Sequence, residues 1–384
     1  RWARRSAQRV LPQLLDLEGA PFTYTLPDAL LELSADITSR ASGQIAISEQ
    51  VTNASTRDRY LVDSLIEEAI TSSQLEGAVT SRRVAKEMLR SGRRPRNHSE
   101  QMIFNNYLAM RRIVELGDAD LTPELVCEIH RIVTAKTLED ETSAGRIQSD
   151  DADRVAVWAE DGQLLHRPPP VAELPMRMNR LCAFANGQDA EAYLPPVLRA
   201  IAIHFMVGYD HYFEDGNGRT ARALFYWSML REGFWLTEFL TISKILKDAP
   251  AQYARSFLLT EQDDGDLTYF FLYHLGVISR AIDDLHRYLA VKAAELADVH
   301  TLLRSHPGKF NHRQLVLLEH AASHPGAVFT ALSHATSHNV TPQSARNDLA
   351  ALEEAGILVR FRQGRQHAWT PAGDVADLVA NLPP

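Results

Sequence analysis

The feature that most constrains the fold is a glycine-rich connection between two long helical patterns. We predict helices over residues 197–209 and 219–232, and Gly216-Asn-Gly218 lies between them. Glycine lets the backbone turn sharply and approach a ligand closely. The first turn of a helix presents unpaired N–H groups and a partial positive charge, so we expect this connection to bind an anion such as phosphate.

The side chains around this connection point to chemistry on phosphates. Arg219 and Arg222 are three residues apart and share one face of the helix, where an anion between them would offset their charge. Asp215 can hold a magnesium ion that bridges phosphate oxygens. His211 is the natural proton acceptor, because its unperturbed pKa is near ~6.5. The combination predicts phosphoryl or nucleotidyl transfer.

Residues 211–222, HYFEDGNGRTAR, resemble the signature of the Fic family, H-x-F-x-(D/E)-G-N-G-R-x-x-R. Every fixed position matches, and the one departure is Tyr212, where the family usually has proline. Helical and hairpin patterns extend the resemblance over roughly residues 50–290. The second glycine of the loop argues against the kinase-like branch of the family, which has lysine there.

The resemblance implies a protein adenylyltransferase that moves AMP from ATP to hydroxyl groups of target proteins. His211 would deprotonate a serine, threonine or tyrosine hydroxyl, Phe213 would anchor the loop in the core, and Asp215 would ligate Mg²⁺. Tyr253 would line the base pocket. The implied nucleotide-binding residues are Gly216, Asn217 (with its side chain), Gly218, Arg219 and Arg222.

Residues 72–77, SSQLEG, resemble the family's inhibitory motif (S/T)-x-x-x-E-(G/N). Glu76 is expected in the last turn of a helix, where a carboxylate costs ~0.3–1 kcal/mol unless a cation offsets it. The resemblance supplies Arg222 as that cation. Ser72 and Glu76 would then form an inhibitory site in which Glu76 takes the place of the γ-phosphate.

The predicted fold class is mainly α, a Fic-domain helical bundle with a β-hairpin flap and a C-terminal winged helix-turn-helix domain. The expected organisation is an N-terminal helical region at 1–115 with the inhibitory helix at about 61–77, a Fic core at 116–295 with the flap at 154–168, and the winged helix at 309–384. Within the last region we expect helices at 314–322, 329–336 and 341–355, and strands at 357–362 and 366–370 around Gly364.

Composition narrows the cellular setting. A net charge of −9 argues against a chain that binds nucleic acid over its whole surface. The two cysteines, Cys127 and Cys182, lie in apolar helical patterns and suit a reducing compartment. No apolar run approaches the ~20 residues of a membrane span, and none follows the basic start at Arg1. We therefore expect a cytoplasmic protein with no membrane partner.

Several alternatives stay open. The chain could be a DNA-binding regulator whose Fic core only senses nucleotide, or a Fic enzyme that uses another nucleotide or removes AMP. The winged helix could bind DNA, for which Arg360, Arg362 and Arg365 are the better-placed cations, or dock a target, or form a homodimer. Three histidines lack metal-site spacing: we expect His130 and His204 at the core edge with one bonded nitrogen each, and His166 in the flap.

Overall fold

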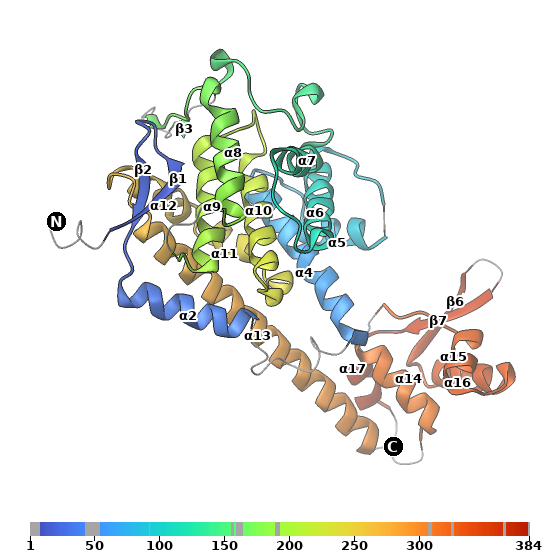
Figure 1. Cartoon of the computed structure of the whole chain (residues 1–384). Helices are drawn as coiled ribbons and strands as arrows, with labels where there is room; N and C mark the ends of the chain where they lie inside the picture. Colours follow the sequence, from blue (N-terminus) through green and yellow to red (C-terminus); the bar gives the residue numbers. More distant parts are fainter. Residues whose placement is uncertain are drawn as a thin grey trace. The chain divides into compact units, whose positions relative to one another are not determined.

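The computed structural model describes residues 8–42, 54–91, 93–154, 157–158, 164–188, 193–305, 309–323, 326–363 and 366–382. They belong to two compact units, residues 1–285 and 286–384 (Figure 1). The prediction of a mainly helical chain is confirmed. Among the described helices, none combines the length and the apolar character needed to cross a bilayer.

The described part of the first unit begins with a β-hairpin, which the prediction of an N-terminal helical region at 1–115 did not include. Strand β1 (Arg9–Leu15) pairs antiparallel with β2 (Pro21–Tyr24). Asp16 closes the turn, since its carboxylate accepts the backbone N–H groups of Glu18 and Ala20. Pro12 breaks the strand pattern in the sequence, but it is tolerated because β1 has only one neighbouring strand.

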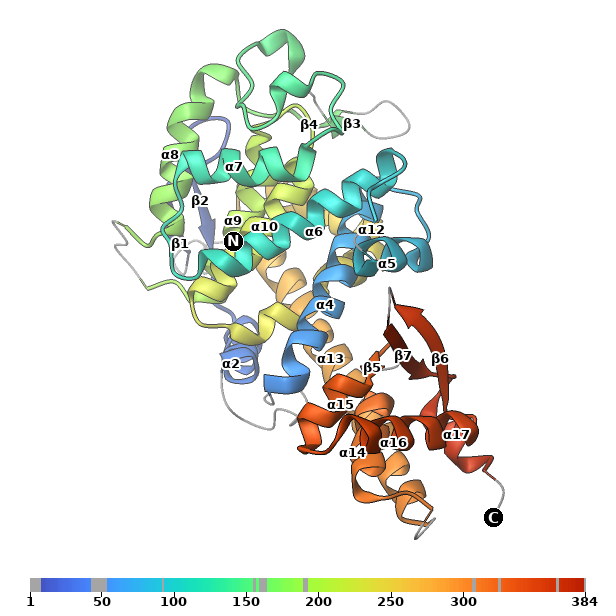
Figure 2. The same cartoon turned by 90° about the vertical axis from the view of Figure 1, so that its right-hand side faces the viewer.

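Apart from the short strands β3 and β4, the rest of this unit as described is helical, and α9 and α10 pack against each other at its centre (Figures 1 and 2). Nearly every residue of both helices is buried. The elements are α2 (Asp28–Ser42), α4 (Ala54–Leu75), α5 (Arg82–Ser91), α6 (His98–Leu116), α7 (Pro123–Thr134), η1 (Glu141–Ser143), η2 (Asp151–Asp153), η3 (Val171–Glu173), α8 (Leu174–Ala185), α9 (Pro196–Asp210), α10 (Asn217–Arg231), η4 (Trp235–Phe239), α11 (Ile242–Asp248), α12 (Pro250–Glu261) and α13 (Thr268–Ser305), whose last part belongs to the second unit.

Helix α4 is the predicted inhibitory helix, with different ends. It begins at Ala54 rather than near residue 61, and it ends at Leu75. Gly77 has a φ of 91° and stops the helix, because its N–H returns to the carbonyl of Gln74. Glu76 therefore lies in the turn that directly follows the helix.

The flap prediction falls partly on described residues. Strands β3 (Val157–Trp158) and β4 (Leu164–His166) pair antiparallel, with Val157 opposite His166. Val155, Ala156 and the predicted turn at 159–163 lie outside the described residues.

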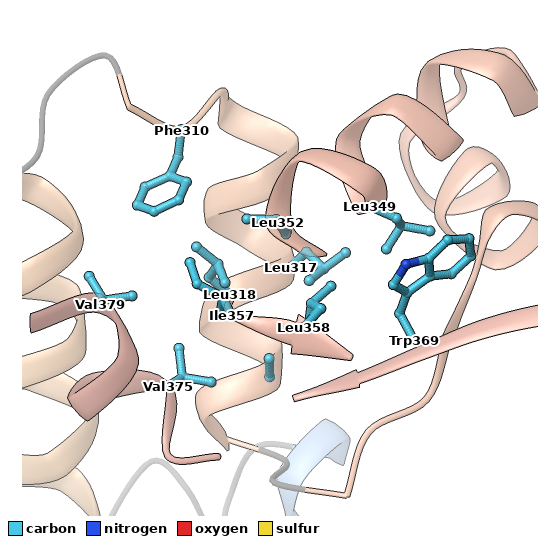
Figure 3. Close-up of a cluster of buried hydrophobic side chains, with 11 residues drawn as sticks. Phe310, Leu317, Leu318, Leu349, Leu352, Ile357, Leu358, Trp369, Val375 and Val379 are labelled. Carbon is cyan, nitrogen blue, oxygen red and sulfur yellow. The ribbon is translucent and has the colours of Figure 1, made fainter. Parts of the chain in front are cut away.

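The second unit contains α14 (His312–Ser323), α15 (Ala331–His338), α16 (Pro342–Glu354) and α17 (Val375–Ala380), with a sheet ordered β5-β7-β6. Its strands are β5 (Phe329–Thr330), β6 (Leu358–Gln363) and β7 (Gln366–Pro371). The predicted helix at 329–336 was misplaced: Phe329 and Thr330 pair with β7, and α15 starts after them. Leucines of α14, α16 and β6 pack with Trp369 in one core (Figure 3). The winged-helix assignment stays a prediction, and Gly364 and Arg365 lie outside the described residues.

Candidate functional site

A cavity of about 360 Å³ opens where α9 ends and α10 begins. The predicted base, the predicted metal ligand, the anion loop and the predicted inhibitory carboxylate all line it. Helix α12 forms the opposite wall. The lining residues are Glu76, His166, Gly208, Tyr209, His211, Glu214, Asp215, Gly216, Asn217, Gly218, Tyr253, Ala254, Phe257, Leu258 and Glu261.

His211 caps α9 in the left-handed conformation, with φ 48° and ψ 59°. Its Nδ1 lies 2.7 Å from the carbonyl oxygen of Gly208, so Nδ1 carries the proton of the neutral ring. Within the described part of the chain Nε2 has no hydrogen-bond partner. Burial lowers the pKa of His211, and the nearby His166 and Arg154 lower it further. A neutral imidazole with a free Nε2 is the form that accepts a proton.

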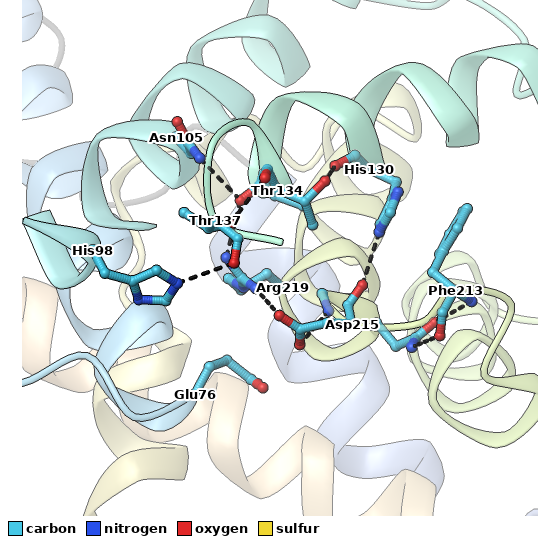
Figure 4. Close-up of polar contacts among 12 residues, drawn as sticks. Glu76, His98, Asn105, His130, Thr134, Thr137, Phe213, Asp215 and Arg219 are labelled. Carbon is cyan, nitrogen blue, oxygen red and sulfur yellow. Dashed lines mark hydrogen bonds and ion pairs between the residues drawn. The ribbon is translucent and has the colours of Figure 1, made fainter. Parts of the chain in front are cut away.

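His130 holds the predicted anion loop in place through two hydrogen bonds and a ring contact. Nδ1 of His130 accepts the N–H of Gly145 at 2.8 Å, and Nε2 donates to the carbonyl of Asp215 at 2.8 Å. Its ring stacks on Phe213, with centroids 3.7 Å apart, and Phe213 is fully buried as expected (Figure 4). The prediction of one bonded nitrogen on His130 was therefore wrong. Burial lowers its pKa to about 4, so it stays neutral while it braces the loop.

Asn217 has a different role from the one predicted for its side chain. Its Oδ1 accepts the N–H of Phe213 at 3.0 Å, and its Nδ2 donates to the carbonyl of Phe213 at 2.7 Å. The side-chain amide thus closes the loop on itself. Gly216, with φ 82°, caps the helix, which leaves backbone N–H groups of the first turn of α10 at the cavity.

Arg219 is buried behind the loop and does not line the cavity. Its guanidinium donates to the carbonyl of Val133 at 2.9 Å and to Asp215 at 3.1 Å. The C-terminal end of α7 that accepts this bond is itself fixed, since Asn105 donates to the carbonyl of Ala135 and His98 bonds Thr137 (Figure 4). The sequence analysis did not predict these hydrogen bonds of Asn105, His98 and Arg219 at the end of α7.

Arg222 is also buried, and it joins α10 to residues 72–76, the predicted inhibitory segment. Nε donates to the hydroxyl of Ser72 at 2.8 Å, and Nη2 donates to the carbonyl of Ser72 at 3.0 Å and to Glu76 at 2.8 Å. The Glu76 carboxylate lies over the first turn of α10: a Cβ on Gly218 would come within 2.3 Å of its Oε1. The buried Nη1 of Arg222 has no partner among the described residues.

Comparison with known proteins places this site in a family. Residues 120–229 match the Fic/DOC family. The chain carries a Fic/DOC family domain. Residues 211–222 fall inside that match, whereas Ser72 and Glu76 precede it and the α12 wall of the cavity follows it.

Relatives with this Fic domain include two proteins named protein adenylyltransferase Fic. The one from Nematostella vectensis is 26% identical over 235 residues, which are 60% of this chain and 49% of that protein. The one from Aedes aegypti is 35% identical over 69 residues, 18% of this chain and 14% of that protein. The chain thus spans about half the length of the first relative.

Solved structures show the same fold. A Fic family protein from Desulfovibrio desulfuricans G20 has a TM-score of 0.59 at 18% identity, and the match covers 91% of this chain and 97% of that chain. Fic-1 (aa134 - 508) from C. elegans has a TM-score of 0.52 at 19% identity, covering 69% of this chain and 73% of that chain.

Three further residues singled out in the sequence, Tyr253, His204 and His166, lie at or near the cavity. Tyr253 lines it, and its hydroxyl lies 2.7 Å from Nε2 of His204, whose Nδ1 has no partner among the described residues. His204 therefore has one bonded nitrogen, as expected. His166 at the end of β4 contacts the carbonyl of Tyr209 at 2.7 Å and Glu261 at 3.0 Å, which ties the flap to α9 and α12.

Asp215 is the residue of the Fic domain that fits a magnesium ion. Its side chain is 57% exposed at the cavity, although Oδ1 accepts the N–H of Gly216 and Oδ2 contacts Arg219. Among the described residues no group of three or more histidine, cysteine or acidic side chains forms a metal cage. One open carboxylate fits magnesium, which typically takes one or two carboxylates and completes its shell with phosphate oxygens and water.

Proposed function

We propose that this chain is a protein adenylyltransferase that transfers AMP from ATP to a hydroxyl side chain of a target protein. The observation that carries the proposal is the shared cavity: it is lined by His211, whose Nε2 has no partner in the described part of the chain, and by the N-terminus of α10. The first is a proton acceptor and the second an anion site, as nucleotidyl transfer requires. The names of the two relatives agree with this activity.

The reaction follows from that arrangement. Nε2 of His211 takes the proton of the target hydroxyl as its oxygen forms a bond to the α-phosphorus of ATP. The bond between the α-phosphorus and the bridging oxygen breaks, and pyrophosphate leaves with the electron pair. The products are the AMP ester of the target and pyrophosphate. Backbone N–H groups at the start of α10 would bind phosphate oxygens, a role we assign to the backbone of Asn217 and not to its side chain.

Asp215 would hold Mg²⁺ beside the phosphates, where the ion neutralises charge on pyrophosphate. Arg222 would serve the outer phosphates: its Nη1 is buried, has no partner among the residues the structure describes, and lies next to Gly218 at the proposed anion site. Arg219 would act mainly by holding Asp215, because its guanidinium already spans Asp215 and the end of α7.

We also propose that Glu76 inhibits the enzyme from within the chain. Its carboxylate lies over the first turn of α10 and pairs with Arg222, so it takes the place that an outer phosphate of ATP needs. Two anions cannot share this place without strong repulsion. ATP would therefore bind weakly, or with its α-phosphate away from His211, until Glu76 moves.

The test uses ATP labelled at the α-phosphate with Mg²⁺ and a cell lysate. We expect little label on protein with the wild type, strong label with Glu76→Gly, and none with Glu76→Gly combined with His211→Ala. Glu67→Gln is the matched control, because Glu67 is a partly buried carboxylate near the same helix end that pairs with Arg82 and does not line the cavity. No label from any variant, with ATP binding intact, would reject the transferase and favour a nucleotide-sensing regulator.

A further inference from the structure

The residue after the predicted base is unusual for the signature, and the structure shows what it does. Tyr212 stands where the family usually has proline, and its side chain is fully buried. Its hydroxyl donates to Oδ2 of Asp210 at 2.6 Å. The residues on either side of His211 are thus joined through their side chains.

Asp210 connects this link to a distant part of the chain. It is the last residue of α9 and fully buried, and its Oδ1 accepts Nη1 of Arg177 at 3.2 Å. Arg177, on α8, also donates to the carbonyls of Leu15 at 2.7 Å and Asp16 at 2.6 Å, at the end of β1. The N-terminal hairpin, α8 and the two residues that flank His211 therefore share one network of hydrogen bonds, and its bonds at Asp210 are fully buried.

The backbone at His211 needs such support. A left-handed conformation costs a residue with a side chain roughly 1–2 kcal/mol, so the surrounding structure must hold it. Arg154 donates to the carbonyls of Asp210 at 2.8 Å and His211 at 2.5 Å, and the N–H of Gln148 donates to the carbonyl of Tyr212 at 2.9 Å. These bonds fix the carbonyls. The Tyr212–Asp210 bond fixes the side chains that flank the base.

We propose that Tyr212, Asp210 and Arg177 form a positioning network that holds His211 with Nε2 toward the cavity, and that the tyrosine hydroxyl supplies the local rigidity that proline usually gives. The inference rests on the proposed function, because it assumes that His211 is the base. None of the three residues lines the cavity, so each acts through His211 rather than on substrate.

The test compares Tyr212→Phe with a buried control in the Glu76→Gly background of the full chain. The substitution deletes one hydroxyl from the network and keeps the ring. We expect kcat to fall by ~10-fold or more while KM for ATP stays within about twofold, because the base shifts but the nucleotide site does not. Tyr226→Phe is the matched control: it also deletes a buried hydroxyl, which contacts Leu240 and Ile242 away from His211. We expect Tyr226→Phe to lose about as much stability as Tyr212→Phe but to keep the kcat of the Glu76→Gly parent.

A second measurement reads His211 directly and does not depend on activity. Nitrogen NMR of histidine-labelled protein, assigned with His211→Ala, should show one Nδ1–H tautomer for the parent protein, because Nδ1 bonds Gly208. Tyr212→Phe should give a mixture of tautomers and a pKa closer to ~6.5. Asp210→Asn keeps the shape of the network and removes the charge of Asp210. It should lower kcat and shift the His211 resonances in the same direction as Tyr212→Phe. The assay runs at pH 8, because burial raises the pKa of Asp210 to about 6.

If Tyr212→Phe leaves both kcat and the His211 resonances unchanged, the proposed positioning role of the network is wrong. If no variant transfers AMP but Tyr212→Phe still alters the His211 resonances, the proposed function fails and the positioning role stands.

Discussion

Neutralising the carboxylate of Glu76 should weaken the fold and strengthen ATP binding at the same time. In Glu76→Gln the amide oxygen can still accept one hydrogen bond from Arg222, so the loss is that of charge rather than of the contact. Arg222 is 1% exposed, and Glu76 is 28% exposed beside an open cavity. The variant therefore isolates the electrostatic part of the pair.

The size of the effect follows from these contacts. Breaking a fully buried ion pair costs ~3–5 kcal/mol, whereas a hydrogen bond to a charged group stabilises a protein by ~1.5–3 kcal/mol and a neutral one by ~0.5–1.5 kcal/mol. Because Arg222 keeps both bonds to Ser72 and one to the amide, we expect a loss of ~1–2 kcal/mol. In a unit of this size that lowers Tm by roughly 2–6 °C.

The same change should raise affinity for ATP. Removing a charge that competes with an outer phosphate by ~1–2 kcal/mol corresponds to roughly 5- to 30-fold tighter binding. AMP lacks the outer phosphates, so its affinity should change by less than about twofold. Calorimetric titration with ATP and AMP in the His211→Ala background, which prevents turnover, together with thermal unfolding, measures both quantities.

Glu67→Gln is the control, since Glu67 lies on the same helix and pairs with Arg82 at 2.7 Å and with Lys86, but does not line the cavity. Its side chain is 15% exposed, so this variant should also lose stability, but it should leave ATP affinity unchanged. Equal ATP affinities for Glu76→Gln and the wild type, or equal gains for ATP and AMP, would refute the assignment of Glu76 to the phosphate position.

Three further predictions concern the base, the loop and the second unit. Because the pKa of His211 is lowered, its neutral, active form predominates at pH 6.5. The kcat/KM of Glu76→Gly should therefore fall to half its maximum only below pH 6.5, and a half-maximum above pH 6.5 contradicts the assignment of His211 as the base. Gly216→Ala should lower ATP affinity at least ~10-fold, because the new methyl would lie 2.6 Å from a threonine methyl, whereas Gly233→Ala, at a similar φ of 83° with no atom within 4 Å, should cost only ~1 kcal/mol of stability and keep ATP affinity. Because α16 carries Glu353 and Glu354 against the single cation Arg346, we expect the full chain to bind DNA no tighter than ~10⁻⁶ M at physiological salt, and fluorescence anisotropy that finds tighter, salt-sensitive binding would favour the DNA-binding alternative.

Prediction from the sequence succeeded where the determinants are local. The cap at Gly216 and the helix that follows are set by residues within one turn of each other. The pairing of Glu76 with Arg222 spans 146 positions, yet it was predictable because a carboxylate at a helix C-terminus calls for a cation and the resemblance supplied one.

Prediction from the sequence failed where the hydrogen-bond partner of a residue lies far along the chain and no motif indicates it. His130 looked like an ordinary core histidine, because its bond to Asp215 joins positions 85 apart. The side chain of Asn217 was assigned to phosphate, although its geometry favours the backbone of Phe213 four residues earlier. Strand β1 was missed because Pro12 interrupts its alternation, which is tolerated only at a sheet edge.

The contact between Glu76 and Arg222 also offsets an unfavourable charge arrangement at the start of α10. Arg219 and Arg222 are both about 1% exposed at the positive end of α10, where the helix dipole opposes a second cation. Asp215 offsets Arg219, and Glu76 offsets Arg222. If Glu76 inhibits the enzyme as we propose, the carboxylate that competes with ATP is also the group that stabilises the buried Arg222. A signal that moves Glu76 would then leave Arg222 without this carboxylate until a phosphate binds, so inhibition and folding stability would change together in any variant of Glu76.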